Sequence, residues 1–367
     1  MRTFAFIIHP LSVNDVARKY PVARFLPLSL VEAFLKAKSP MVLSEIKGVR
    51  SLTGEGLKGW FIGCPLTPRQ LSGGVPLELV YQRLQESCEI AHRQGAEIIG
   101  LGAFTAVAGD GGITVAKRSP IPVTTGNSYT VATAIEGTLD ACKQVGIEAS
   151  SSTLAVVGAT GSIGKTCARI LSATFERVIL IGRDPSRTRD LAEEIPHSEP
   201  TTDLERLVEA DAVITVTSSD AAIIQPHHLK TGSVVCDVAR PRDVSAKVVG
   251  QRPDVLLIEG GVVSVPGDVD FGMDFGFPPK TAYACMCETM MLALEGRLEN
   301  YTLGKDVSVE QVKETQGWAN KHGFKLAGYR SFQRAVSQED IARVRAARAA
   351  AIPSPVSLRE KSSPLRP

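Results

Sequence analysis

Two cysteines stand close together in a late apolar stretch of this sequence, at Cys285 and Cys287. The apolar pattern over 281–294 predicts a helix, in which Cys285 and Glu288 share a face while Cys287 points elsewhere. A thiolate is a strong nucleophile, and the positive start of a helix lowers the pKa of a thiol placed there. Either cysteine is therefore a candidate nucleophile, although a single buried cysteine usually serves as a small apolar side chain.

A run of hydroxyl and amide side chains at Thr124–Thr130 is the second group that could do chemistry. It directly precedes an apolar helical pattern from Val131 to Gln144. Capping of that helix would occupy one of these side chains. The others remain as candidates to bind a ligand oxygen.

A strand, a glycine turn and a helix follow one another from Leu154 to Leu171. This order is typical of the phosphate-binding corner of a Rossmann unit. A Cβ at the glycines would block the turn and the approach of a pyrophosphate, and the amides of the helix start would face the phosphates. The candidate contacts are Gly158, Thr160, Gly161, Ser162, Ile163 and Gly164.

The next strand decides between NAD and NADP. An NAD site usually places an acidic side chain at the end of this strand, whereas here the strand runs into Arg183, with Arg187 one turn later. Two guanidinium groups suit a 2′-phosphate, so we expect NADPH, although Asp184 could still meet a ribose hydroxyl. Later strands end at Thr217 and Ser218, where the nicotinamide would lie, and at the further candidates Gly260 and Gly261.

Composition limits the classes of function. The 41 basic and 39 acidic residues nearly cancel, which gives no reason to expect nucleic-acid binding. The seven cysteines lack metal-ligand spacing, so we expect no metal and a reduced, cytoplasmic protein. No apolar run is long enough to span a membrane. The sequence does not indicate an oligomeric state.

The predicted fold class is α/β, because strands alternate with helical patterns. A Rossmann-type parallel sheet over 129–264 is flanked by an N-terminal α/β domain over 1–128 and a helical segment over 265–335 that carries both cysteines. Residues 336–367 form a tail, in which an Ala- and Arg-rich helix from Gln338 leads into a stretch rich in Pro and Ser. We expect this tail to be disordered.

Several segments together resemble the long-chain acyl-[acyl-carrier-protein] reductases of the cyanobacterial type, which make fatty aldehydes. They occur in order over nearly the whole chain up to about residue 330. The matching segments are Ile8-His9, Leu101–Thr105, Thr124–Asn127, Val156–Gly164, Gly260–Val263, Tyr283–Glu288, Leu294–Gly296 and His322–Phe324. The tail departs from the pattern.

The resemblance implies that Cys285 is the acylated nucleophile and that Cys287 is a packing residue. It further implies that NADPH reduces the acyl-enzyme, that 1–128 binds the acyl chain and its carrier, and that an aldehyde-consuming enzyme could be a partner. Thr125, Asn127 and Ser128 are our candidate donors to the developing oxyanion. His9 is a candidate general acid or a structural residue.

The resemblance implies that the acyl donor is an acidic carrier protein, with coenzyme A as the alternative carrier. Its dock could be a basic stretch that otherwise forms a solvated face: Lys36, Lys38, Lys47, Arg50 and Lys58. Two other interpretations stay open. The segments 182–187 and 237–243 are similar to stretches of glutamyl-tRNA reductase and shikimate dehydrogenase, which would make this another NADPH oxidoreductase. The chain could also bind NADPH and a lipid without catalysis.

Overall fold

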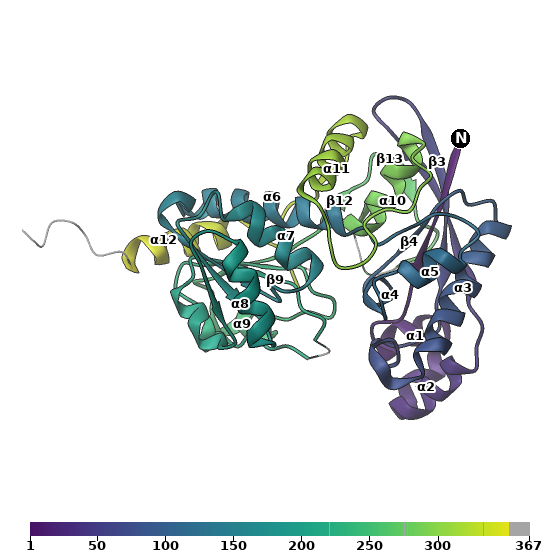
Figure 1. The fold of residues 1–367 in the computed structure, drawn as a ribbon, viewed down its shortest axis with the longest axis horizontal. Helices are drawn as coiled ribbons and strands as arrows, with labels where there is room; N and C mark the ends of the chain where they lie inside the picture. The colour runs from purple at the N-terminus through teal and green to yellow at the C-terminus, as the bar shows by residue number, and fades with distance from the viewer. Residues whose placement is uncertain (220, 275, 277, 333, 352–367) are drawn as a thin grey trace, which may run out of the picture.

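The computed structural model describes residues 1–219, 221–274, 276, 278–332 and 334–351. Two six-stranded sheets occupy the two ends of the molecule (Figure 1). Between them lie three helices, α6 (Asn127–Val145), α10 (Ala284–Glu295) and α11 (Val309–His322). The α/β class expected from the sequence is confirmed.

The Rossmann sheet has the strand order β11-β10-β9-β6-β7-β8, with every pair parallel. This is the doubly wound order, in which the strand order across the sheet reverses between β6 and β9 while the strands stay parallel. Five of its six strands are buried almost throughout, which explains their continuous apolar sequences, whereas the edge strand β8 is polar and only partly buried. The strands are β6 (Thr153–Val157), β7 (Arg177–Ile181), β8 (Ser198–Thr201), β9 (Ala212–Thr215), β10 (Val234–Asp237) and β11 (Leu256–Glu259), accompanied by α7 (Ser162–Leu171), α8 (Pro185–Glu194) and α9 (Lys247–Gln251).

The N-terminal sheet has the order β13-β2-β3-β1-β4-β5. Along β1 the side chains alternate between its two faces. Phe4 and Phe6 belong to the core that contains α10, whereas Ala5 and Ile7 belong to the core that contains α3. The elements are β1 (Arg2–Ile8), β2 (Met41–Arg50), β3 (Gly56–Gly63), β4 (Ile99–Leu101), β5 (Val123–Thr124), α3 (Leu77–Arg93), α4 (Phe104–Val107) and α5 (Ile113–Arg118).

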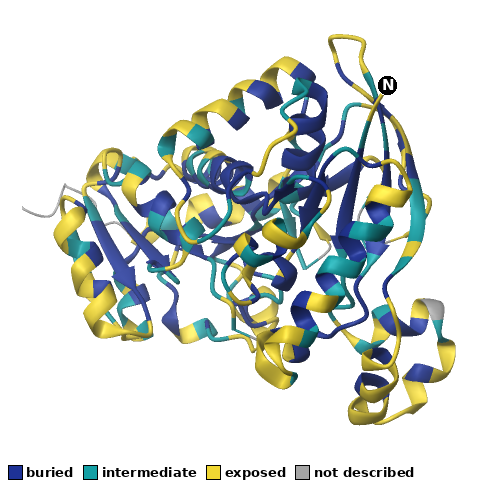
Figure 2. Cartoon of the chain, turned by 45° about the vertical axis from the view of Figure 1, so that its right-hand side comes forward, coloured by how far each residue is buried: buried dark blue, intermediate teal, exposed yellow. Residues whose placement is uncertain are grey.

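A small helical cap, residues 12–36, projects from this sheet (Figures 1 and 2). It consists of α1 (Val13–Lys19), a 3₁₀ turn (Pro21–Phe25) and α2 (Leu28–Lys36). Its inner side chains form a core cluster of their own, made by Val16, Ala17, Ala23, Val31 and Leu35.

Residues 265–335 do not form a domain of their own, which corrects the expected division. The strand β13 (Gly267–Asp270) pairs antiparallel with β2 and so becomes the edge of the N-terminal sheet. Ten of the twelve residues of α10 are buried. A helix that is apolar all round must be covered on every side, and α10 packs against β1, β4 and α6.

Short strands connect this segment to the rest of the chain. One three-stranded sheet joins β14 (Thr281–Tyr283), β12 (Val262–Ser264) and β15 (Lys325–Leu326). A hairpin is formed by β16 (Arg330–Ser331) and β17 (Arg334–Ala335). The helix α10 therefore begins directly after β14, three residues later than the sequence pattern predicted.

The Ala- and Arg-rich helix expected from Gln338 is present, so the disorder expected for the tail does not apply to 336–351. The helix α12 (Gln338–Ala351) packs on α6, buries Ile341 and Val344, and places Arg348 Nη1 2.9 Å from Asp211 Oδ1. Residues 352–367, which contain the Pro- and Ser-rich stretch, lie outside the described residues. Within the part of the chain that the structure describes, no helix combines the length and the apolar character needed to cross a bilayer.

Candidate functional site

A single cavity of about 1000 Å³ is bordered by both sheets. At one end it is lined by the glycine corner of the Rossmann domain, and at the other by the inner side of the cap. Every expected cofactor residue except Gly164 lines it, and so do three of the four expected catalytic residues, Cys285, Thr125 and Asn127. The fourth, Ser128, does not line the cavity and is fully buried.

The glycine corner has the geometry that a dinucleotide needs. Gly158 adopts φ +80°, which is a left-handed conformation that favours glycine. A Cβ on Gly164 would lie 2.4 Å from the carbonyl oxygen of Gly158, so Gly164 allows α7 to pack against the end of β6. Since α7 begins at Ser162, its first amides face the cavity, where they can bind phosphate.

The acidic residue after β7 is engaged elsewhere. Asp184 is the N-cap of α8, and its Oδ1 accepts hydrogen bonds from the backbone amides of Ser186 (3.0 Å) and Arg187 (3.1 Å). Arg183 and Arg187 both line the cavity. Two guanidinium groups and no available carboxylate fit a 2′-phosphate, so this end of the cavity is built for NADPH.

The loop after β9 is held by a buried acid. Thr217 donates its amide (2.8 Å) and its hydroxyl (2.5 Å) to the carboxylate of Asp243. Thr217 lines the cavity as expected, but its hydroxyl is already engaged within the protein. Ser218 and the backbone of this loop remain at the cavity surface.

Cys285 is the second residue of α10 and is partly exposed. The amide of the preceding residue, Ala284, donates to the carbonyl of Gly261 at 2.7 Å, which fixes the start of α10 beside Gly260 and Gly261. On its other side, the Cα of Gly126 lies against Cys285. The candidate nucleophile thus stands between the polar loop and the end of β11.

The pKa of Cys285 is shifted in the direction opposite to the expected one. Burial and the nearby carboxyl of Glu288 raise the pKa of the thiol to about 12, although the helix start was expected to lower it. Desolvation of a charge outweighs a helix dipole here. In the free protein, Cys285 is therefore a neutral thiol near neutral pH.

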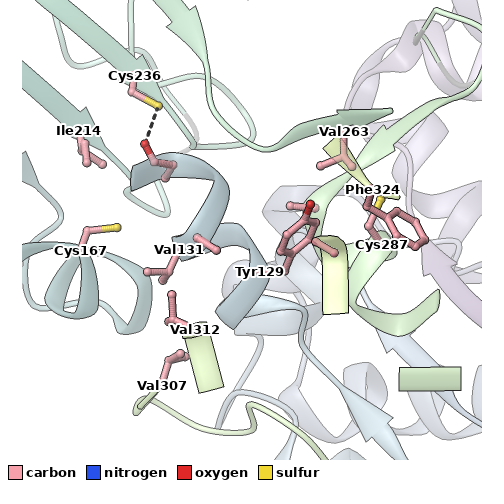
Figure 3. Close-up of a cluster of buried hydrophobic side chains, with 14 of the residues drawn as sticks. Tyr129, Val131, Cys167, Ile214, Cys236, Val263, Cys287, Val307, Val312 and Phe324 are labelled. Carbon is pink, nitrogen blue, oxygen red and sulfur yellow. Dashed lines mark hydrogen bonds between the residues drawn. The ribbon is translucent and has the colours of Figure 1, made fainter. Parts of the chain in front are cut away.

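Cys287 is a core residue. It is fully buried in the cluster that contains Tyr129, Val263 and Phe324 (Figure 3). Burial raises the pKa of its thiol well above the usual value. The packing role that the resemblance implied agrees with this placement.

Glu288 organises the polar loop from one turn below Cys285. Its fully buried carboxylate accepts hydrogen bonds from the hydroxyls of Thr124 (2.6 Å), Ser128 (2.6 Å) and Thr302 (2.9 Å), and from the amide of Tyr129 (3.0 Å). The sequence placed Glu288 and Cys285 on one helix face. It did not identify the hydrogen-bond donors to Glu288, most of which lie far away in the chain.

These contacts correct two of the three expected oxyanion donors. The hydroxyl of Ser128 faces Glu288, and the hydroxyl of Thr125 donates to the carbonyl of Thr302 at 2.6 Å. Asn127 keeps its place at the cavity, where its side-chain nitrogen donates to Ser162 Oγ at 3.1 Å. Asn127 therefore joins the polar loop to the glycine corner.

His9 lines the cavity but has the environment of a structural residue. Its Nε2 accepts from the amide of Phe104 at 3.3 Å, and its Nδ1 lies 3.2 Å from the carbonyl oxygen of Pro10. Burial lowers the pKa of this histidine to about 4, so the ring is neutral. Both ring nitrogens are engaged in hydrogen bonds within the protein, so neither has a free proton to donate as a general acid.

Two residues of the site were not predicted from the sequence. Arg240 lines the cavity, and its guanidinium lies 5.5 Å from the centre of the Tyr283 ring. The predicted strand before it was found, but nothing in the sequence indicated that the following loop turns toward α10. Gly126 was noted only as part of the polar loop. A glycine within a run of polar side chains was the signal that another segment could approach closely there.

Among the described residues, one group of three side chains has ligand atoms close enough to hold a metal: Glu205, His227 and His228. None of them lines the cavity. The Nδ1 of His228 accepts a hydrogen bond from the amide of Gln225 (3.1 Å), which leaves the ring proton on Nε2, the atom that faces Glu205. This arrangement is that of a hydrogen-bonded surface cluster.

A family model described as shikimate / quinate 5-dehydrogenase matches residues 140–259. The match covers the last six residues of α6 and the whole Rossmann sheet. This stretch is a dinucleotide-binding domain of the kind found in NADP-dependent oxidoreductases, and its cofactor is NADPH.

Three curated proteins are similar over longer or partly different ranges. Aminotransferase PigE of a Serratia strain is 29% identical over 92% of this chain, and the chain spans 41% of its length. Long-chain acyl-[acyl-carrier-protein] reductase of Synechococcus elongatus is 27% identical over 88% of this chain and 98% of its own length. Glutamyl-tRNA reductase of Sorangium cellulosum is 26% identical over 45% of this chain and 32% of its own length.

Proposed function

We propose that the protein reduces a long-chain acyl thioester to the aldehyde with NADPH, through an acyl group held on Cys285. The observation that carries the proposal is that one cavity is lined by Cys285, by the glycine corner and by a group of apolar side chains. The similarity to an acyl-[acyl-carrier-protein] reductase over most of both chains supports the same substrate class.

The reaction begins at the sulfur of Cys285. The sulfur attacks the thioester carbonyl, the bond between that carbon and the carrier thiol breaks, and the departing thiolate takes up the proton that Cys285 loses. NADPH, when bound at the glycine corner, supplies the hydride that reduces the acyl carbon. The bond between the acyl carbon and the sulfur then breaks to release the aldehyde, and the sulfur of Cys285 takes up a proton from solvent to return to the free thiol.

The first turn of α6 supplies donors for the developing oxyanion. The amides of Asn127 and Ser128 belong to this turn, so no carbonyl four residues earlier in the helix accepts from them. The turn begins directly after Gly126, which lies against Cys285. Backbone amides and the Asn127 side chain thereby replace the hydroxyls expected from the sequence.

The arm of the cavity that leads away from Cys285 suits an aliphatic chain. It runs toward the cap between apolar side chains from β1, the loop that follows it, β2, α1, α2 and α4: Phe6, Ile8, Leu11, Val16, Leu35, Met41, Leu43 and Phe104. Burial of methylene groups against such walls is favourable at about 0.8 kcal/mol each. A glutamyl or shikimate substrate would gain little there, which favours the acyl substrate over the other two reductase activities.

The acidic carrier is best placed beside Lys36 and Lys38. Lys47 and Lys58 share the carboxylate of Glu45, at 3.4 and 2.7 Å, which reduces their attraction for another acid. Lys47 also lies about 20 Å along β2 from the start of this strand, which is the end that lines the cavity. Lys38 lines the cavity, so a carrier bound there would deliver its acyl group inward. An aldehyde-consuming enzyme as recipient of the product is part of this proposal.

Covalent trapping tests the proposal. The protein is incubated, without NADPH, with radiolabelled palmitoyl thioester of acyl carrier protein or of coenzyme A, and the acyl group is located by peptide mass spectrometry. We expect label on Cys285 in the wild type and in Cys287→Ala, and none in Cys285→Ala. Glutamyl-tRNA and shikimate with NADPH serve as competing substrates. Full reductase activity of Cys285→Ala would refute the acyl-enzyme.

A further inference from the structure

The outer side of the cap carries an apolar surface that no part of the described chain covers. Every residue from Arg24 to Leu30 is exposed. Four of these seven are large apolar residues, of which Phe25 is 85% and Leu30 55% exposed. Val22 and Phe34 are further exposed large apolar residues of the cap. We call the whole set the cap patch: Val22, Phe25, Leu26, Leu28, Leu30 and Phe34.

The charges around the cap patch are of one sign. No acidic residue occurs between Tyr20 and Val31, whereas Arg24 lies inside the patch and Lys36 and Lys38 follow it. Lys38 Nζ lies 4.9 Å from the centre of the Phe34 ring. The two acids of the cap are both engaged: Asp15 accepts from the amides of Leu11 and Ser12, and the buried Glu32 pairs with Arg69.

The inner side of the same cap lines the cavity. Val16, Tyr20 and Leu35 belong both to the cap and to the cavity wall. The same two short helices and turn therefore carry both cavity-lining residues and the cap patch. Figure 2 shows the cap as a mostly exposed projection at one end of the molecule.

We propose that the cap patch binds the surface of an anionic lipid bilayer. A projecting tip with exposed aromatic and aliphatic side chains can insert between lipid headgroups, and neighbouring arginine and lysine side chains then meet the lipid phosphates. Because the patch is narrow and projects, it suits insertion into an interface better than docking against the flat surface of a second protein. The basic charge at its edge selects anionic over neutral lipids.

This inference goes beyond the reductase activity and does not depend on it. Binding to a bilayer is measured without substrate or cofactor, so failure of one proposal can be told apart from failure of the other. If both hold, the arm of the cavity opens next to the lipid phase into which an aldehyde product would partition.

Co-sedimentation with vesicles tests the inference. The full chain is mixed with sucrose-loaded vesicles of phosphatidylcholine, with or without phosphatidylglycerol, and the pelleted fraction is measured. We expect the wild type to pellet with the anionic vesicles, and the triple variant Phe25→Ser, Leu28→Ser, Leu30→Ser to lose at least about 10-fold in apparent affinity. Arg24→Glu should lower binding to anionic vesicles and leave binding to neutral vesicles unchanged.

A matched control removes as much exposed apolar surface elsewhere. Leu52, Val208 and Val249 are exposed large apolar residues outside the cap, and their triple replacement by serine should leave vesicle binding unchanged. Circular dichroism and NADPH affinity verify that each variant is folded. Absence of wild-type binding to anionic vesicles, or equal binding by the cap variant, would overturn the inference. Loss of a dimer in the cap variant without any vesicle binding would instead assign the patch to self-association.

Discussion

Gly126 and Cys285 are in direct contact at the meeting point of two helix starts. A Cβ built on Gly126 would lie 2.2 Å from both the Cα and the Cβ of Cys285. Gly126 is the N-cap of α6 and adopts φ +74°, while Cys285 lies in the first turn of α10. The absence of one side chain therefore lets the start of α6 lie against Cys285.

Replacement of Gly126 by alanine should damage the site more than the fold. The left-handed conformation costs a non-glycine residue about 1–2 kcal/mol, and the clash with Cys285 adds to that cost. Because displacement of a reacting group by about 1 Å can cost about 100-fold in rate, we expect kcat to fall by about that factor. NADPH affinity should change little. Steady-state kinetics and cofactor titration measure both.

Gly146→Ala is the matched control for this variant. Gly146 has φ +78°, and a Cβ there would meet nothing within 4 Å. The control carries the same backbone strain without the clash. If both variants lose stability equally and both keep full activity, the contact between Gly126 and Cys285 has no role in catalysis.

Glu288→Gln should weaken the support under the site. The neutral amide has a single acceptor oxygen for the four donors that the carboxylate now serves, and the amide of Tyr129 cannot reverse its role as the hydroxyls can. We expect a loss of about 1–3 kcal/mol in the free energy of unfolding and a lower kcat. Urea denaturation measures the first quantity. The exposed Glu310→Gln is the control, and an unchanged midpoint in Glu288→Gln would contradict this account.

The two arginines after β7 should set the preference for NADPH over NADH. Loss of a charge-assisted contact with the 2′-phosphate should weaken NADPH by about 10-fold in Arg183→Ala or Arg187→Ala, with NADH affinity nearly unchanged. Fluorescence titration of both dinucleotides gives the ratio. Arg189→Ala, an exposed residue on α8 outside the cavity lining, should preserve it. Parallel losses for the two cofactors would remove the 2′-phosphate from the explanation.

Alkylation of Cys285 should be slow and steeply dependent on pH. Because the pKa of this thiol is raised to about 12, its reactive thiolate fraction grows about tenfold for each pH unit throughout the neutral and moderately alkaline range. We therefore expect the rate with iodoacetamide to rise without a plateau between about pH 7 and pH 10. Cys285→Ala identifies the modified residue by mass spectrometry. A plateau near neutral pH would mean that the thiolate is stabilised.

Burial of the other thiols should limit stability at high pH. Burial raises the pKa of Cys64, Cys88, Cys142 and Cys236 from 9.0 to about 12. A raised pKa stabilises the fold fully below pH 9.0, and this contribution is lost as pH rises toward 12, because the unfolded chain ionises its thiols first. The melting temperature should therefore fall steadily above about pH 9. A constant value up to pH 11 would contradict the burial of these thiols.

The local parts of the structure could be predicted from the sequence. The glycine corner, the parallel strands and the two arginines are each encoded within about 30 residues, where turn, periodicity and charge are visible together. The resemblance to a family assigned different roles to Cys285 and Cys287. The partial exposure of Cys285 and the burial of Cys287 agree with these roles.

Contacts between distant segments could not be predicted. The hydroxyls of Thr124 and Ser128 looked available because their acceptor, Glu288, lies about 160 residues later. The pKa of Cys285 depends on how deeply α10 is buried, and a helix start alone gives no measure of that. The pairing of β13 with β2 likewise joins strands more than 200 residues apart.

That pairing has a consequence for synthesis on the ribosome. The edge strand of the first sheet and the helix that covers Phe4 and Phe6 both emerge only after the complete nucleotide domain has been translated. Until then the nascent N-terminal region exposes an open strand edge and an uncovered apolar face. A fragment ending before Gly267 should consequently require chaperones or aggregate, while the nucleotide domain between can fold first.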